Sequence, residues 1–337
     1  MATTPTRPNA RAARGRKGGF SPVRYERIVV PLDGTPFAEA ALRPAAELAA
    51  RADAALHVVT ALPQRGSSAV MMEPIPVDEA EPVRTTTELN DYLLQVEDRV
   101  RGEWECAVSS RLLVDGPTAA ALLEYVEEVD GDLVIAATHS HNLLVRTLLG
   151  STAIDLVRGS SCPVLLVPSS DPAPDPLETP LQESVSTVVA SVDPLADPSN
   201  IALGHAVSWA RAWGAELRLV HTTVEHPLPA VGFEGAGPIS TAGRVVLDDR
   251  AEKVAEARLA AIVYTLRAAG VDADSRVLRG SRISDAIAAF VENNDVDLVV
   301  AGRSDRSPFA RIWMGSESDR LARRVRSAGI LLCPLEG

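Results

Sequence analysis

Residues 132–168, which read DLVIAATHSHNLLVRTLLGSTAIDLVRGSSCPVLLVP, decide the fold. The apolar run at 133–137 predicts a buried strand, and residues 164–167 predict a second one. Between them, Gly150 and Ser151 precede a helix that is expected from Thr152 to about Ser160. A strand that leads through a small-residue turn into a helix N-terminus is a common anion site. Free backbone N–H groups and the positive end of the helix then face one crevice.

The same layout returns near the C-terminus. Residues 297–334 read DLVVAGRSDRSPFARIWMGSESDRLARRVRSAGILLCP, and Gly315 lies 18 positions after Asp297, as Gly150 does after Asp132. The beginnings of the two halves also match, because RIVVPLD at 27–33 parallels TVVASVD at 187–193. The chain is therefore a tandem duplication, and its fold and function have to be worked out for each half.

Length and composition limit the class of protein. A chain of 337 residues exceeds the size of one hydrophobic core, so two domains are expected. The formal net charge of −12 argues against a nucleic-acid partner. No apolar run approaches a membrane span, no signal peptide is visible, and the three cysteines fit no metal spacing. These features predict a cytoplasmic protein with reduced thiols and no membrane partner.

The predicted domain organisation has four parts. Residues 1–24 form a basic leader without acidic residues, which is expected to be disordered. Residues 25–168 form the first α/β domain, 169–184 a Pro-rich linker, and 185–337 the second α/β domain. Strands alternate with helices in both domains, which predicts two tandem Rossmann-like, doubly wound parallel sheets.

The last apolar strand of each domain predicts how the domains associate. Residues 164–167 and 330–333 come last in their sheets, so they are expected at sheet edges. Apolar edge strands need covering, and pairing with each other covers them. We therefore expect the two domains to pair within the chain, the isolated halves to dimerise, and the protein to form a homodimer.

These residues resemble the universal stress protein family. The resemblance covers residues 25–335 and implies the same Rossmann-like fold. The residues that carry it are Val-Pro-Leu-Asp33, Asp132-Leu-Val, Thr138-His139, Leu148-Leu149-Gly150-Ser151 and Cys162-Pro163-Val-Leu-Leu-Val-Pro168. In the nucleotide-binding branch of the family, an aspartate after the first strand lies beside adenosine. The end of the second strand reads the adenine edge. By resemblance, these positions are Asp33 and Ala61 in the first half, and Asp193 and Thr222 in the second.

The same branch carries Gly-x-x-Gly, nine further residues, and then Gly-Ser or Gly-Thr around the phosphates. The corresponding residues of the first half are Ala137, Ser140, Gly150 and Ser151, followed by Thr152. Those of the second half are Gly302, Asp305, Gly315 and Ser316. The ligand that the resemblance implies is ATP or AMP, with Mg²⁺ only as the companion of ATP.

Both halves depart from this pattern, in different ways. Ala137 and Ser140 replace glycines but add no charge, and Ser140 could donate to a phosphate. The second half has Asp305 at the second glycine position and Glu317 after Gly315-Ser316. At an effective dielectric of about 20, two like charges 4 Å apart cost roughly 4 kcal/mol before screening. Binding is therefore expected to be weak and to occur in the N-terminal half.

Alternatives to a ligand role remain for several of these residues. Asp33 and Asp193 could be turn or helix-capping aspartates, the default at a strand–helix junction. Trp209 and Trp213 are interpreted as core or interface anchors. The sequence has no nucleophile elbow, no Walker lysine and no metal cluster, so no catalytic residue is predicted. The favoured function is binding; the alternatives are a module that dimerises and docks a partner protein without nucleotide, and a slow ATP hydrolase.

Overall fold

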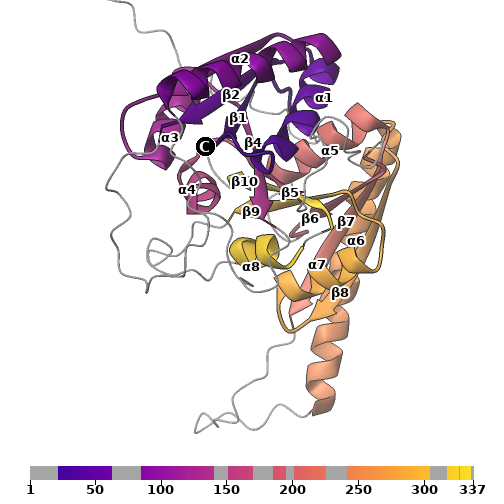
Figure 1. Ribbon diagram of the computed structural model, residues 1–337. Helices are drawn as coiled ribbons and strands as arrows, with labels where there is room; N and C mark the ends of the chain where they lie inside the picture. Colours follow the sequence, from indigo (N-terminus) through magenta and orange to yellow (C-terminus); the bar gives the residue numbers. More distant parts are fainter. Residues whose placement is uncertain are drawn as a thin grey trace, which may run out of the picture.

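The computed structural model describes residues 22–62, 85–139, 151–169, 185–194, 201–224, 241–303, 317–325 and 327–334. Its strands form one continuous sheet in the order β3-β2-β1-β4-β5-β10-β9-β6-β7-β8 (Figure 1). The strands of the first half are β1 Arg27–Leu32, β2 Ala55–Ala61, β3 Val108–Leu113, β4 Leu133–His139 and β5 Val164–Ser169. Those of the second half are β6 Thr187–Ser191, β7 Glu216–Val224, β8 Ala273–Gly280, β9 Leu298–Arg303 and β10 Gly329–Pro334.

The two halves repeat one topology. All strand pairs within a half are parallel, and both halves follow the order third, second, first, fourth, fifth strand. This is the doubly wound arrangement that the alternation of strands and helices predicts, so the predicted fold class is confirmed. In each half the strand order reverses between the first and fourth strands, where such folds have their crevice.

The predicted pairing of the two last strands is also confirmed. β5 and β10 are antiparallel neighbours, with Leu331 opposite Leu165, and they join the two half-sheets. The edges that would be exposed in separate halves are thereby covered within one chain.

Helices cover both faces of the sheet. One face carries the 3₁₀ helix η1 Ala38–Ala41 and the helices α1 Leu42–Ala52, α2 Thr86–Glu103, α5 Ile201–Trp213 and α6 Thr241–Ala268. The other carries α3 Thr118–Glu128, α4 Ser151–Gly159, α7 Ile283–Glu292 and α8 Glu317–Arg324. Each face has one core cluster with residues from both halves. In β1, Ile28 and Val30 belong to one cluster and Val29 to the other, which explains why the strands are continuous apolar runs.

Local backbone chemistry explains how α1 begins and where α2 ends. The sequence predicts that Pro44 kinks or restarts its helix, and the structure shows a restart. η1 ends at Ala41, and Pro44 lies in the first turn of α1, where a missing N–H leaves no hydrogen bond unmade. The apolar stripe predicts a second helix to residue 107. However, α2 ends at Glu103 because Trp104 is extended, with φ −128° and ψ 135°.

Two aspartates accept hydrogen bonds from the backbone at the amino ends of the first strands of the two halves. The Asp132 carboxylate accepts hydrogen bonds from the backbone N–H groups of Glu26, at 2.6 Å, and Arg27, at 3.2 Å. Asp297 does the same in the second half, accepting from the N–H groups of Ser186 and Thr187 at 2.8 and 2.9 Å. Burial raises the pKa of Asp132, and these backbone donors oppose that rise.

Candidate functional site

The candidate site of the first half lies at the carboxyl ends of β1, β2 and β4. Leu32 pairs with Thr60, so the next residues along the two strands, Asp33 and Ala61, lie beside each other. Val29 pairs with Val134, and continuing this register brings Leu32 opposite Ala137. Asp33, Ala61 and Ala137 therefore meet where the strand order reverses. Figure 1 shows the neighbouring strands β2, β1 and β4 that carry them.

The second half has the same geometry. Ser191 pairs with Val220, which brings Asp193 opposite Thr222, and Ala190 pairs with Val300, which brings Val192 opposite Gly302. Asp33 and Asp193 are therefore equivalent, as are Ala61 and Thr222, and Ala137 and Gly302. The equivalences that the resemblance implies agree with the strand register.

Asp33 has a definite role in its own turn. Its Oδ1 accepts hydrogen bonds from the backbone N–H of Thr35, at 2.9 Å, and from the Thr35 hydroxyl, at 2.6 Å. Thr35 Oγ1 in turn accepts from the N–H of Ala38 at 3.2 Å, and Gly34 takes a positive φ of 83°. Asp33 is thus a turn aspartate, as the alternative interpretation held. Asp33 is also exposed, at the carboxyl end of β1, so a ligand role stays open to it as well.

A buried polar cluster beside Asp33 was missed by sequence reasoning. Glu39, in η1, is only 7% exposed, and its carboxylate accepts a hydrogen bond from Arg99 Nη2 of α2. Burial, and then the neighbouring carboxylates of Glu39 and Asp33, raise the pKa of Tyr92. Tyr92 is therefore a neutral hydroxyl in this cluster at neutral pH. An acid inside the apolar stripe at 38–49 was the available signal.

The equivalent site of the second half has different neighbouring side chains. Arg258 of α6 donates from Nη1 to the carbonyl of Pro194, next to the exposed Asp193, at 3.2 Å. Thr222 is 9% exposed, and within the described part of the chain its hydroxyl has no hydrogen-bond partner. A buried hydroxyl without a partner is unfavourable, so this position differs chemically from Ala61 of the first half.

The phosphate-binding positions are only partly described. The helix α4 begins at Ser151, one residue before the expected start at Thr152, and Thr152 lies half-buried in its first turn. Ala137 and Gly302, on β4 and β9, are half-buried as well. Ser140, Gly150, Asp305, Gly315 and Ser316 lie outside the described residues, so their convergence stays a prediction.

The described residues offer neither a metal site nor a membrane span. Among them, no group of three or more His, Cys, Asp or Glu side chains could hold a metal ion. Within the described residues, Cys106, Cys162 and Cys333 form no disulfide bond. None of the helices in the described ranges is long and apolar enough to cross a membrane.

Comparison with known proteins gives one consistent family. The family model described as "Universal stress protein family" matches residues 24–168 and again residues 185–328. The universal stress protein MJ0531 of Methanocaldococcus jannaschii is 28% identical over 151 residues, which are 42% of this chain and 82% of that protein. A protein of the same family name from Staphylococcus saprophyticus is 31% identical over 144 residues, or 42% and 83% of the two chains.

A solved structure resembles the whole molecule. The crystal structure of a universal stress protein from Archaeoglobus fulgidus covers 94% of this chain and 98% of its own, with a TM-score of 0.62 and 14% identity. At this identity the likeness concerns the fold. Fold and site thus define a tandem α/β protein with one strand switch point per half. The two family matches then show that the chain belongs to the universal stress protein family.

Proposed function

We propose that this tandem universal stress protein acts by binding, and that its N-terminal crevice holds adenine nucleotide, ATP or AMP, weakly. The observation that carries the proposal is the meeting of Asp33, Ala61 and Ala137 at the strand switch point of the first half. Open α/β sheets bind their ligands at this point. The exposed Asp33 carboxylate can accept hydrogen bonds from ribose hydroxyls, and the backbone after Ala61 can read a base edge.

The N-terminal crevice is preferred for electrostatic reasons. Ala137 adds only a methyl group where the family has glycine, and a small steric misfit can relax. In the second half, Asp305 and Glu317 add carboxylates to the sequence around the phosphate positions. Repulsion between a carboxylate and a phosphate is not relieved by a small shift. With ATP, Mg²⁺ would accompany the phosphates.

A second candidate function follows from the same substitutions. Both halves have lost at least one leading glycine, which also suits a module that no longer holds nucleotide and instead docks a partner protein. A cytoplasmic location and a homodimer stay predictions for this protein. Because β5 and β10 pair inside one chain, a homodimer would need a different surface from those two strands.

The test is the nucleotide content of the purified protein. The protein is denatured and the released small molecules are identified by mass spectrometry. A parallel sample is first incubated with AMP or with ATP and Mg²⁺ and then desalted. The proposal predicts adenine nucleotide in at least the incubated sample. Absence from both samples, together with no heat of binding in calorimetry, would favour the partner-docking function.

A further inference from the structure

The contact between α1 and α5, which lie side by side across the join of the two halves, is chemically asymmetric (Figure 1). Backbone hydrogen bonds fix which residues are equivalent. Ala54 N–H donates to Ala49 O after α1, and Ala215 N–H donates to Ala210 O after α5. The resulting equivalent pairs are Leu48 with Trp209, Pro44 with His205, Glu47 with Ser208, and Ala52 with Trp213. Before the first strands, Ala55 N–H donates to Glu26 O and Glu216 N–H to Ser186 O, so Tyr25 is equivalent to Val185.

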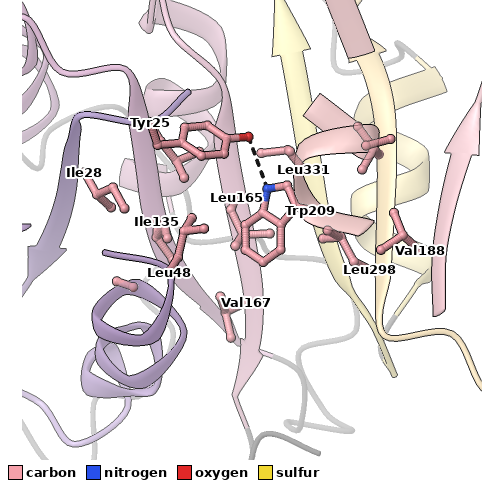
Figure 2. Packing of buried hydrophobic residues seen from close by; sticks show 14 of the residues in the cluster. Tyr25, Ile28, Leu48, Ile135, Leu165, Val167, Val188, Trp209, Leu298 and Leu331 are labelled. Atoms are coloured by element: carbon pink, nitrogen blue, oxygen red, sulfur yellow. Dashed lines mark hydrogen bonds between the residues drawn. The ribbon is translucent and has the colours of Figure 1, made fainter. Parts of the chain in front are cut away.

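One side of this contact is a buried row of three hydrogen-bonded side chains. Trp209 Nε1 donates to the Tyr25 hydroxyl oxygen at 3.1 Å (Figure 2). Tyr25 Oη also lies 2.7 Å from Nδ1 of His205. The indole can only donate, so the Tyr25 hydrogen is directed at His205, which carries its own proton on Nε2. The exposed fractions of Tyr25, His205 and Trp209 are 2%, 4% and 2%. Water therefore cannot replace any hydrogen-bond partner among these three side chains.

The opposite side of the contact has no such groups. There, the equivalent residues are Val185, Pro44 and Leu48, none of which has a polar side-chain atom. The direct contact between α1 and α5 also differs between its two equivalent sides. Trp213 donates to Glu47 at 3.2 Å and lies under the Arg51 guanidinium, 5.1 Å from the ring centroid. Its equivalent, Ala52, can do neither.

The backbone join alone does not explain why unlike halves pair. β5 and β10 pair through Leu165 and Leu331, and the sequences Val-Leu-Leu-Val and Ile-Leu-Leu-Cys are similar enough for like strands to pair. Any discrimination between unlike and like halves must therefore come from side chains. Two first halves would bring the Tyr25 hydroxyl against Pro44 and Leu48, and two second halves would bring His205 and the Trp209 N–H against Val185. Each like pair would bury polar atoms without partners, which is unfavourable.

We propose that the two halves are specific partners for each other, and that Tyr25, His205 and Trp209 determine this specificity. The surface formed by His205, Ser208, Trp209 and Trp213 on the second half fits the first half of this chain and disfavours a second copy of itself. Ser208 contributes by accepting a hydrogen bond from the Val23 N–H at 2.6 Å. Association through the β5–β10 join is thereby restricted to unlike halves. A half expressed alone is then not expected to pair with itself, in contrast to the expectation from the apolar strands alone.

The test uses the full chain with a protease site inserted between residues 169 and 185. Labelled and unlabelled protein are cut, mixed, and left to exchange, and the pairs are counted by native mass spectrometry. Pairs of one first half with one second half are expected, with like pairs below about a hundredth of the total. Like pairs in statistical proportion, or cut halves that separate as monomers, would overturn the proposal.

Three variants make the test specific. Val185→Tyr gives the second half its own hydroxyl for His205 and Trp209, so pairs of two second halves should increase at least tenfold. Tyr25→Phe removes the hydroxyl that two first halves would bury unpaired, so pairs of two first halves should increase. Tyr125→Phe is the matched control, because that hydroxyl lies 3.3 Å from Nδ1 of His57 within the first half. Unchanged pairing in both Val185→Tyr and Tyr25→Phe would refute the assignment; if cut Val185→Tyr protein unfolds, Tyr25→Phe decides.

Discussion

His205 should make the stability of the protein depend on pH between about 6.5 and 4. It is 4% exposed, and burial lowers its pKa from 6.5 to about 4. The unfolded chain therefore takes up a proton first as the pH falls. The contribution of His205 to the free energy of unfolding is therefore constant above pH 6.5. It decreases progressively as the pH falls from 6.5 to 4. The fall of the pKa from 6.5 to about 4 corresponds to about 3 kcal/mol of unfolding free energy.

Urea unfolding at pH 7, 6, 5 and 4.5 would measure this loss. Carboxylates and other histidines also titrate in this range, so the wild type is compared with His205→Gln, which can still accept from Tyr25 but does not titrate. Between pH 7 and 4.5, the free energy of unfolding of the wild type should fall by about 2 kcal/mol more than that of the variant. Equal pH slopes for the two proteins would refute the claim that His205 is buried in its neutral form.

Three further substitutions test other parts of the structure. Asp132→Ala should lower the free energy of unfolding by about 1–3 kcal/mol, because two backbone N–H groups lose their acceptor. Urea unfolding should give a similar loss for Asp297→Ala. No loss in either variant would contradict the role of these aspartates as acceptors for the strand backbone. Leu331→Ala, at the β5–β10 join, should cost about 2–5 kcal/mol in thermal unfolding, and a loss under about 1 kcal/mol would show that the join contributes little. Asp33→Ala should change stability by no more than about 1 kcal/mol, because Asp33 is exposed, yet weaken adenine nucleotide binding at least tenfold in calorimetry; an equal loss in Asp193→Ala would contradict the N-terminal assignment.

The fold follows from regularities that the sequence displays directly. Apolar strands alternate with helical stripes, and the equal spacing from Asp132 to Gly150 and from Asp297 to Gly315 reveals the repeat. The match of residues 27–33 with 187–193 makes Asp33 equivalent to Asp193, the family resemblance implies that Ala61 is equivalent to Thr222, and the strand register agrees with both.

Contacts between distant residues could not be predicted in the same way. The Glu39–Arg99 pair joins residues 60 apart, and Trp209 finds Tyr25 across 184 residues. No local pattern specifies such pairs, since they depend on how helices cross the sheet. The role of Asp132 was hidden for the same reason, because it appears in the sequence as a family marker and acts in the structure as an acceptor for distant backbone donors. The end of α2 was misplaced because apolar spacing continued to Trp104, where the backbone is already extended.

The most direct test of nucleotide binding is calorimetric titration of AMP, and of ATP with Mg²⁺, into three proteins. These are the wild type, Gly150→Glu and Gly315→Glu. Each variant places the same carboxylate beside one predicted phosphate position. We predict one weak site per chain in the wild type, lost in Gly150→Glu and little changed in Gly315→Glu. Binding that survives in Gly150→Glu and disappears in Gly315→Glu would assign the site to the second half. No binding to the wild type would contradict the nucleotide function itself.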